Sequence, residues 1–349
     1  MSQKTVFISG ANGEVGHGLI KYLSDHGGYR IVALDIQPLD KELASRCDTV
    51  IEKSILDERA IEDLGAKFEF DVIFHLAGLL STGSEKSPLK GHQLNVNGSV
   101  SLLELAAKQS RSRLKPVIFM FPSTIAVYGL GSLDEKMRAG AVRETENLTP
   151  VTMYGANKLY IESLGRYYSE HYQLLTAEAD LPKLDFRAIR FPGIISAETM
   201  PSSGTSDYCP EMLHAAAKNE AYECFVREDA AISFMVMPDA VRSLIELSEA
   251  DAAKLSQRVY NISAFSLTAG EIKSEILKYF PEANITFRGN GPRQFIIDTW
   301  PVDVDQSKAR SDWGWKAAYD LNRSFEEYLV PGVISRYGLN DFKKKCANC

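Results

Sequence analysis

A tyrosine and a lysine lie four residues apart in the segment MYGANKL, residues 153–159. Because side chains at that spacing share one face of a helix, Tyr154 and Lys158 would lie side by side if the segment is helical. A free tyrosine loses its proton at about pH 10, and a neighbouring ammonium group favours the phenolate and lowers that pKa. The pair is therefore a candidate base for taking the proton from a substrate alcohol.

Two hydroxyl side chains, Ser123 and Thr124, end the apolar segment KPVIFMFPST. We interpret this segment as a strand, and parallel sheets bind ligands beyond the carboxyl ends of their strands. Either hydroxyl could then hold the oxygen of the alcohol. None of the six histidines has the spacing of a metal ligand, so we expect a site without a metal.

A glycine-rich turn precedes these residues in the chain. SGANGEVG places Gly10, Gly13 and Gly16 between a predicted strand and a predicted helix. Glycines there permit a tight turn and let a diphosphate approach the N-terminus of the helix. Asp35 ends the following strand, where a carboxylate can accept both hydroxyls of an adenosine ribose and repel a 2′-phosphate. The turn and Asp35 together predict NAD rather than NADP.

Apolar strands alternate with amphipathic helices through the first 195 residues. That alternation predicts an α/β fold with a doubly wound parallel sheet, and the changed pattern beyond it predicts a smaller mixed α/β capping lobe. The stretches 129–149 and 174–184 are polar and are predicted to be loops. The predicted division is a dinucleotide-binding domain (1–192 and 231–264), a substrate-binding lobe (193–230 and 265–335) and a tail (336–349).

Bulk properties narrow the class of protein. The net charge of −7 argues against a nucleic-acid surface, which would need a basic patch. No apolar run approaches the roughly 20 residues that span a bilayer, and no signal-peptide pattern begins the sequence, so we expect a cytoplasmic protein. Five cysteines, with Cys346 and Cys349 in a polar tail, do not suggest a disulfide framework or a zinc site.

Five segments resemble the extended short-chain dehydrogenase/reductase family: GANGEVG, FHLAG, NVNGSVSLLELA, STIAVYG and YGANK. The resemblance implies that Thr124, Tyr154 and Lys158 form the catalytic set. It makes Asn95 a structural hydrogen-bond partner, and His75 is most simply a core residue. Together with the glycine turn, it implies NAD contacts from Gly10, Asn12, Gly13, Glu14, Val15, Gly16, Asp35, Ile36, Ser54, Ile55, Leu76, Ala77, Tyr154, Lys158 and Ile194.

The resemblance also bears on the reaction. Dehydratases of this family usually carry an acid and a base where Ile125 and Ala126 stand, and these side chains cannot move protons. The segments RFPGIIS, GTSDY, MPDA and DTWPVDVDQSKARSDWGW resemble the short-chain, zinc-independent type of L-threonine 3-dehydrogenase. That likeness implies NAD-dependent oxidation of L-threonine to 2-amino-3-oxobutanoate. The substrate contacts expected are Ser81, Thr124, Tyr154 and Thr205, and Trp300 either lines the pocket or packs the lobe.

Two alternatives remain at this point. A nucleotide-sugar 4-epimerase would use the same tyrosine, lysine and threonine with bound NAD, and would need arginines for a diphosphate. Arg227, Arg288 and Arg293 are available but lie in no recognisable motif. A non-catalytic NAD-sensing protein would often lack the tyrosine or the lysine. Relatives of this type commonly dimerise through two helices per subunit, so a homodimer through helices at 94–108 and 154–172 is expected.

Overall fold

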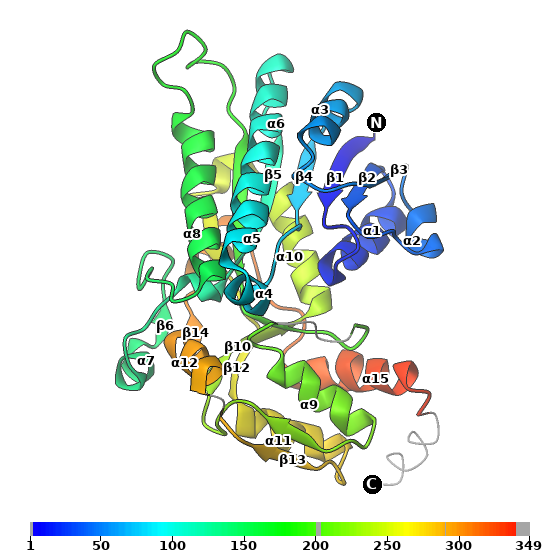
Figure 1. Ribbon diagram of the computed structural model, residues 1–349, viewed down its shortest axis with the longest axis vertical. Helices are drawn as coiled ribbons and strands as arrows, with labels where there is room; N and C mark the ends of the chain where they lie inside the picture. The colour runs from blue at the N-terminus through cyan, green and yellow to red at the C-terminus, as the bar shows by residue number, and fades with distance from the viewer. Residues whose placement is uncertain (1–2, 200–203, 290, 340–349) are drawn as a thin grey trace.

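A seven-stranded parallel sheet is central to the computed structural model, which describes residues 3–199, 204–289 and 291–339 (Figure 1). The strand order is β11-β7-β5-β4-β1-β2-β3, so it reverses between β1 and β4. Doubly wound sheets bind ligands at such a reversal. The predicted fold class is confirmed. The two cysteines of the predicted tail, Cys346 and Cys349, lie outside the described residues. The strands are β1 (Lys4–Ser9), β2 (Tyr29–Asp35), β3 (Thr49–Glu52), β4 (Val72–His75), β5 (Ile118–Thr124), β7 (Asp185–Phe191) and β11 (Val259–Asn261).

Helices cover both faces of this sheet because its strands are apolar on both sides. Val6 and Ile8 belong to the core on the face that α1 and α10 cover, whereas Phe7 between them belongs to the core under α3, α6 and α8, as the alternation of side chains along a strand requires. All three side chains are fully buried. The helices are α1 (Glu14–His26), α3 (Glu58–Lys67), α6 (Gly98–Ser112), α8 (Met153–Arg166) and α10 (Met237–Glu249), with the short α2 (Lys41–Ser45) beside α1.

A second apolar core lies beyond the carboxyl ends of the central strands (Figure 1). Its three-stranded sheet has the order β12-β10-β8. Strand β10 pairs here with β8 and β12, although the predicted division placed it in the larger domain. The division itself stays a prediction. The elements are β8 (Gly193–Ile195), α9 (Tyr208–Ala217), β9 (Tyr222–Cys224), β10 (Ala231–Val236), β12 (Phe265–Thr268), α11 (Ala269–Tyr279), β13 (Ile285–Phe287), α12 (Gly291–Thr299), β14 (Asp303–Val304) and α15 (Val330–Arg336). Helix α13 (Ser307–Trp313) packs instead in the core of the central sheet, beside β11.

The polar stretch 129–149 contains a helix and a strand where a loop was predicted. Ser132 caps α7 (Leu133–Ala139), and the buried Lys136 of that helix donates a hydrogen bond to the carbonyl of Ile297 at 2.8 Å. In the described residues, no helix has the length and apolar character needed to cross a membrane. The remaining elements are α4 (Ser81–Lys86), α5 (Pro88–His92), η1 (Gln93–Asn97), η2 (Ile125–Val127), β6 (Ala141–Val142), η3 (Tyr167–His171), η4 (Ala252–Lys254), α14 (Leu321–Arg323) and η5 (Ser324–Leu329).

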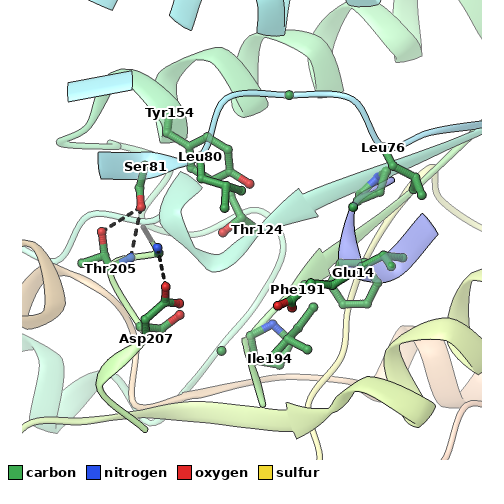
Figure 2. A pocket seen from close by; sticks show the side chains of 18 of the residues that line it. Glu14, Leu76, Leu80, Ser81, Thr124, Tyr154, Phe191, Ile194, Thr205 and Asp207 are labelled. Carbon is green, nitrogen blue, oxygen red and sulfur yellow. Dashed lines mark hydrogen bonds between the residues drawn. The ribbon is translucent and has the colours of Figure 1, made fainter. Parts of the chain in front are cut away.

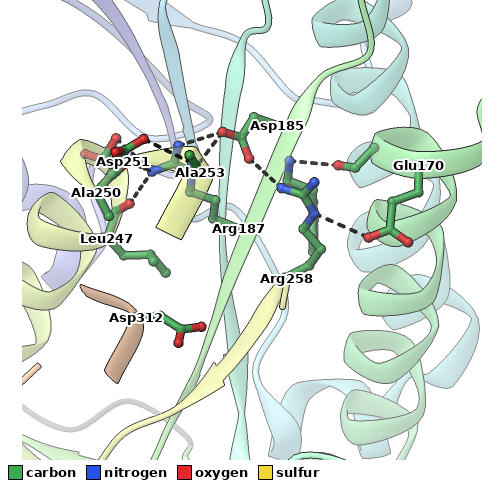
Figure 3. Close-up of polar contacts among 12 residues, drawn as sticks. Glu170, Asp185, Arg187, Leu247, Ala250, Asp251, Ala253, Arg258 and Asp312 are labelled. Carbon is green, nitrogen blue, oxygen red and sulfur yellow. Dashed lines mark hydrogen bonds and ion pairs between the residues drawn. The ribbon is translucent and has the colours of Figure 1, made fainter. Parts of the chain in front are cut away.

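A buried ionic cluster holds the amino end of β7 (Figure 3). Asp185 accepts from Arg187 at 2.6 Å and from Arg258 at 3.0 Å. Arg187 also donates to the carbonyls of Leu247 and Ala250, which end α10, at 2.6 and 2.8 Å. The cluster therefore ties β7 to α10 and β11 at the edge of the sheet opposite the carboxyl ends of the strands.

Candidate active site

The glycine turn between β1 and α1 has the geometry of an anion cradle. Gly10 has a φ of +72°, and a Cβ there would lie 2.5 Å from the backbone nitrogen of Ala77. A Cβ on Gly16 would lie 2.5 Å from the carbonyl oxygen of Ala11. Among the described residues, no side chain caps the N-terminus of α1, where the N-cap residue is Gly13. These features fit the diphosphate of a dinucleotide.

Gly10→Ala is expected to weaken NAD binding at least about tenfold, because the added methyl forces Gly10 and Ala77 apart at the cradle. The left-handed backbone should also cost about 1–2 kcal/mol of folding free energy. Gly140→Ala is the matched control, since Gly140 has a φ of +62° and a Cβ added there would meet no described atom within 4 Å. Calorimetric NAD affinity and thermal unfolding of both variants test this. Equal NAD affinity in the two variants would contradict it.

Asp35 lies at the end of β2 with its carboxylate beside the glycine turn. It accepts hydrogen bonds from the backbone N–H groups of Asn12 and Gln37, each at 2.9 Å. Ile36 next to it is exposed, whereas Ile55 is buried under Gly98. The carboxylate is thus placed where an adenosine ribose would follow the diphosphate. Six of the predicted cofactor residues do not line the cavity that opens at the carboxyl ends of the strands: Asn12, Asp35, Ile36, Ser54, Ile55 and Ala77.

A cavity of about 350 Å³ opens over the carboxyl ends of the central strands (Figure 2). The glycine turn, the β4–α4 connection, the end of β5, α8 and the β7–β8 connection all contribute to its wall. Segments far apart in sequence therefore meet at one site. The predicted residues that line the cavity are Gly10, Gly13, Glu14, Val15, Gly16, Leu76, Ser81, Ser123, Thr124, Tyr154, Lys158, Ile194, Thr205 and Trp300.

Helix α8 brings Tyr154 and Lys158 to this cavity. The hydroxyl of Thr152 caps the helix by accepting from the N–H of Gly155 at 3.0 Å. A Cβ on Gly155 would lie 2.0 Å from the carbonyl oxygen of Ala126, so the glycine lets α8 approach the segment that follows β5. The Lys158 ammonium lies 5.6 Å from the centre of the Tyr154 ring and donates to the carbonyl of Pro122 at 2.6 Å.

The electrostatics of this pair differ from the expectation. Burial raises the pKa of Tyr154, and burial lowers the pKa of Lys158 to about 7, while the negative charge of Glu162 raises it in part. In the chain by itself, Lys158 therefore does not lower the pKa of the phenol below its usual value. The expectation considered the charges of the lysine and of a bound nicotinamide ring, whereas in the chain by itself the removal of both side chains from water is the larger effect.

A buried network supports the strand end next to Tyr154, and the sequence interpretation missed it. Glu162 lies one turn beyond Lys158 on α8 and accepts from Arg190 at 2.9 and 2.6 Å. The hydroxyl of Ser123 also donates to Glu162, so Ser123 is held toward the sheet interior. The neighbouring Thr124 accepts from the N–H of Ala126 at 3.1 Å, which leaves its own proton for another acceptor.

The other wall of the cavity carries two hydroxyls and a carboxyl (Figure 2). Ser81 at the start of α4 accepts from the N–H and the hydroxyl of Thr205, at 3.1 and 2.8 Å. Asp207 accepts from the N–H of Gly204 at 2.6 Å, and burial raises the pKa of its carboxyl. Asp207 was missed, although it belongs to the GTSDY segment and an amino-acid substrate needs an acceptor for its ammonium. Asn95 holds the wall by bonding both the N–H and the carbonyl of Leu79.

His75 is a core residue, as predicted. Its Nδ1 lies 2.7 Å from the Ser9 hydroxyl and its Nε2 lies 2.8 Å from the Ser99 hydroxyl. Because the Ser99 hydroxyl donates to the carbonyl of Asn95, Nε2 carries the ring proton and Nδ1 accepts from Ser9. Burial lowers the pKa of His75 to about 3, so the ring stays neutral. Across the described residues, no group of three or more histidine, cysteine or acidic side chains is arranged to hold a metal ion.

The three arginines considered for a sugar-nucleotide clamp do not line the cavity. Arg227 pairs with Asp229 and Asp298, each at 2.9 Å. Arg288 lies 3.8 Å from Glu223, and Arg293 lies over the ring of Phe225.

Comparisons with known proteins agree with this geometry. Residues 6–263 match the model of the NAD dependent epimerase/dehydratase family. The mitochondrial L-threonine 3-dehydrogenase of Bos taurus is 34% identical over 319 residues, covering 91% of this chain and 80% of that protein. The solved L-threonine dehydrogenase of Clostridium difficile is 31% identical, with a TM-score of 0.83 over 96% of this chain and 99% of that one.

Two further solved structures concern the oligomeric state and the epimerase alternative. A monomeric L-threonine 3-dehydrogenase from a metagenome is 30% identical, with a TM-score of 0.80 over 94% of this chain and 98% of that one. A UDP-glucose 4-epimerase of Thermotoga maritima has a TM-score of 0.77 but only 19% identity, over 95% of this chain and 99% of that one. The likeness to the epimerase shows a shared fold alone.

Proposed function

The chain belongs to the NAD dependent epimerase/dehydratase family, and we propose that within it the protein oxidises the 3-hydroxyl of L-threonine to give 2-amino-3-oxobutanoate. It is an NAD-dependent oxidoreductase of the extended short-chain type. One observation carries the choice of substrate. A single cavity joins the Tyr154–Lys158 pair and Thr124 to a wall where Ser81, Thr205 and Asp207 offer hydroxyls and a carboxylate.

The residues of the chain divide the chemistry among them. NAD, when bound, supplies the acceptor for the hydride from C3 of the substrate. The N-terminus of α1 holds the diphosphate, Asp35 holds the adenosine ribose, and Lys158 holds the second ribose. The Tyr154 phenolate takes the proton from the 3-hydroxyl as the C3–O bond becomes a carbonyl, and the Thr124 hydroxyl donates to that oxygen. Proton and hydride thus leave from opposite ends of the same O–C–H unit.

The substrate wall suits a zwitterion. Ser81 already accepts two hydrogen bonds from Thr205, so its own proton is free to be donated to a carboxylate. Asp207 is half-buried and offers an acceptor to the ammonium group. Because burial raises the pKa of Asp207, ammonium binding strengthens as the pH rises and the carboxylate forms.

The direct test is to mix the purified protein with NAD and L-threonine and to follow the absorbance of NADH. We expect NADH to form with L-threonine, and to form more slowly with L-serine, which lacks the 4-methyl group. The same protein should not interconvert UDP-glucose and UDP-galactose. Interconversion without any NADH from threonine would assign the site to the epimerase alternative.

Asp207→Asn is expected to lower kcat/KM for L-threonine about 10- to 150-fold, mostly through KM, because a charged hydrogen bond of about 1.5–3 kcal/mol is lost. Glu211→Gln is the matched control. Glu211 lies in the first turn of α9, which Asp207 precedes, and burial raises the pKa of its carboxyl too, but it accepts from Tyr222 at 2.6 Å and does not line the cavity. Steady-state kinetics of both variants decide the point. An unchanged KM in Asp207→Asn would remove the ammonium contact.

We also propose that the protein forms a homodimer through α6 and α8. Tyr160 and Tyr167 on and beyond α8 are 50% and 41% exposed, which is a large aromatic surface for one helix face. Light scattering should therefore give the mass of two chains. The mass of one chain would favour the monomeric state named for one of the similar structures.

A further inference from the structure

Glu14 places a carboxyl inside the anion cradle. It is the first residue of α1, directly after Gly13, and its side chain lines the cavity (Figure 2). Leu76, Phe191 and Ile194 share that part of the wall, so the surroundings are largely apolar. An ionised side chain and a diphosphate would therefore compete for the same helix N-terminus.

The groups that face Glu14 favour its neutral form. Burial is the largest cause that raises the pKa of its carboxyl, and the negative charge of Asp207 from the start of α9 raises it further. A hydrogen bond with Thr199 acts in the other direction. From η5, Tyr328 presents a phenol whose pKa is raised mainly by burial and, to a smaller extent, by the charges of Glu198 and Glu14. Among the described residues, the charge that acts on Glu14 from another element is that of Asp207, and it is negative.

A bound diphosphate adds negative charge next to this carboxyl. An ionised carboxylate would then be repelled by the diphosphate, whereas a protonated carboxyl could donate a hydrogen bond to one of its oxygens. We propose that Glu14 takes up a proton when NAD binds and, as the protonated carboxyl, donates a hydrogen bond to a diphosphate oxygen, so that NAD affinity falls as the pH rises. The inference rests on the NAD site of the proposed function and does not depend on the substrate.

His17 is a titratable group close to the glycine turn that could also gain a proton. Its Nε2 lies 3.0 Å from Oδ1 of Asn12, and burial lowers its pKa. A bound diphosphate could also draw a proton onto this ring. The experiment must therefore separate Glu14 from His17.

Isothermal titration calorimetry of NAD binding, in pairs of buffers with different ionisation enthalpies from pH 6 to 9, measures the protons taken up. The variants are Glu14→Gln, which keeps a donor but cannot ionise, and His17→Gln. Glu198→Gln serves as the control, because Glu198 is exposed and pairs with Lys21 at 3.5 Å. Thermal unfolding of each variant establishes that it is folded.

For the unaltered protein we expect uptake of up to one proton and an apparent Kd that rises by up to about tenfold per pH unit where Glu14 is ionised. Glu14→Gln should abolish both effects and bind NAD more tightly at pH 9, while His17→Gln and Glu198→Gln should retain them. Proton uptake that persists in Glu14→Gln, or none in the unaltered protein, would overturn the inference. Because no threonine is present, a failure of the proposed substrate would leave this result unchanged.

Discussion

Tyr154→Phe is expected to lower kcat for threonine oxidation by about 10²- to 10⁴-fold, the usual contribution of a positioned general base. Phenylalanine keeps the ring that packs against the second core, so the fold and NAD affinity should be retained. Calorimetric NAD binding and single-turnover NADH formation separate the two effects. Loss of NAD binding together with activity would mean that the phenol holds the cofactor rather than moves a proton.

The pH dependence of kcat is an independent test of the assignment of Tyr154 as the general base. Burial raises the pKa of Tyr154 above its usual value, so the phenol is mostly protonated at neutral pH, and kcat should increase as the pH rises through and beyond neutrality. The residual rate of Tyr154→Phe should lose this dependence. Tyr160→Phe is the control on the same helix, because Tyr160 is half exposed and does not line the cavity. A Tyr160→Phe profile that matched Tyr154→Phe would contradict the assignment.

Local patterns explain why so much of the site could be predicted from the sequence. The glycine turn, the strand that ends in Ser123 and Thr124, and the spacing of Tyr154 and Lys158 are each encoded within a few neighbouring residues. The alternation of strands and helices then requires that their ends meet at one edge of a parallel sheet. The contacts of Thr124, Tyr154, Lys158 and the substrate wall with ligands stay predictions.

What the sequence did not reveal depends on distant partners. Glu162 is bonded to Arg190, and no local pattern pairs the two. The shifts in the pKa values of Tyr154 and Lys158 follow from burial, which spacing alone cannot give. Helix α7 was missed because its stretch is polar, and the contact of Lys136 with α12 becomes visible only in three dimensions.

Glu162→Gln is expected to destabilise the protein by about 3–5 kcal/mol, because Arg190 would remain buried without its counter-charge. Both side chains are almost fully buried, and Arg190 also donates to the hydroxyl of Tyr128 at 2.8 Å and to the carbonyl of Glu144 at 2.7 Å. Urea unfolding measures the loss. The double variant Glu162→Gln with Arg190→Met removes both charges and should recover part of the stability, which a loss of packing alone would not do.

Glu162→Gln should also lower kcat, because it changes the charge state of Lys158. Glu162 is the charge that raises the pKa of Lys158 against burial, so its removal lowers that pKa further below its ordinary value. Above neutral pH, each unit of that fall would leave about tenfold fewer charged lysines, and kcat would fall in proportion. Asp185→Asn breaks the ionic cluster at the other end of β7 (Figure 3) and should cost comparable stability without changing the pH profile. If both variants altered the pH profile of kcat alike, Glu162 would serve the fold alone. A change confined to Glu162→Gln would mean that Glu162 keeps Lys158 charged.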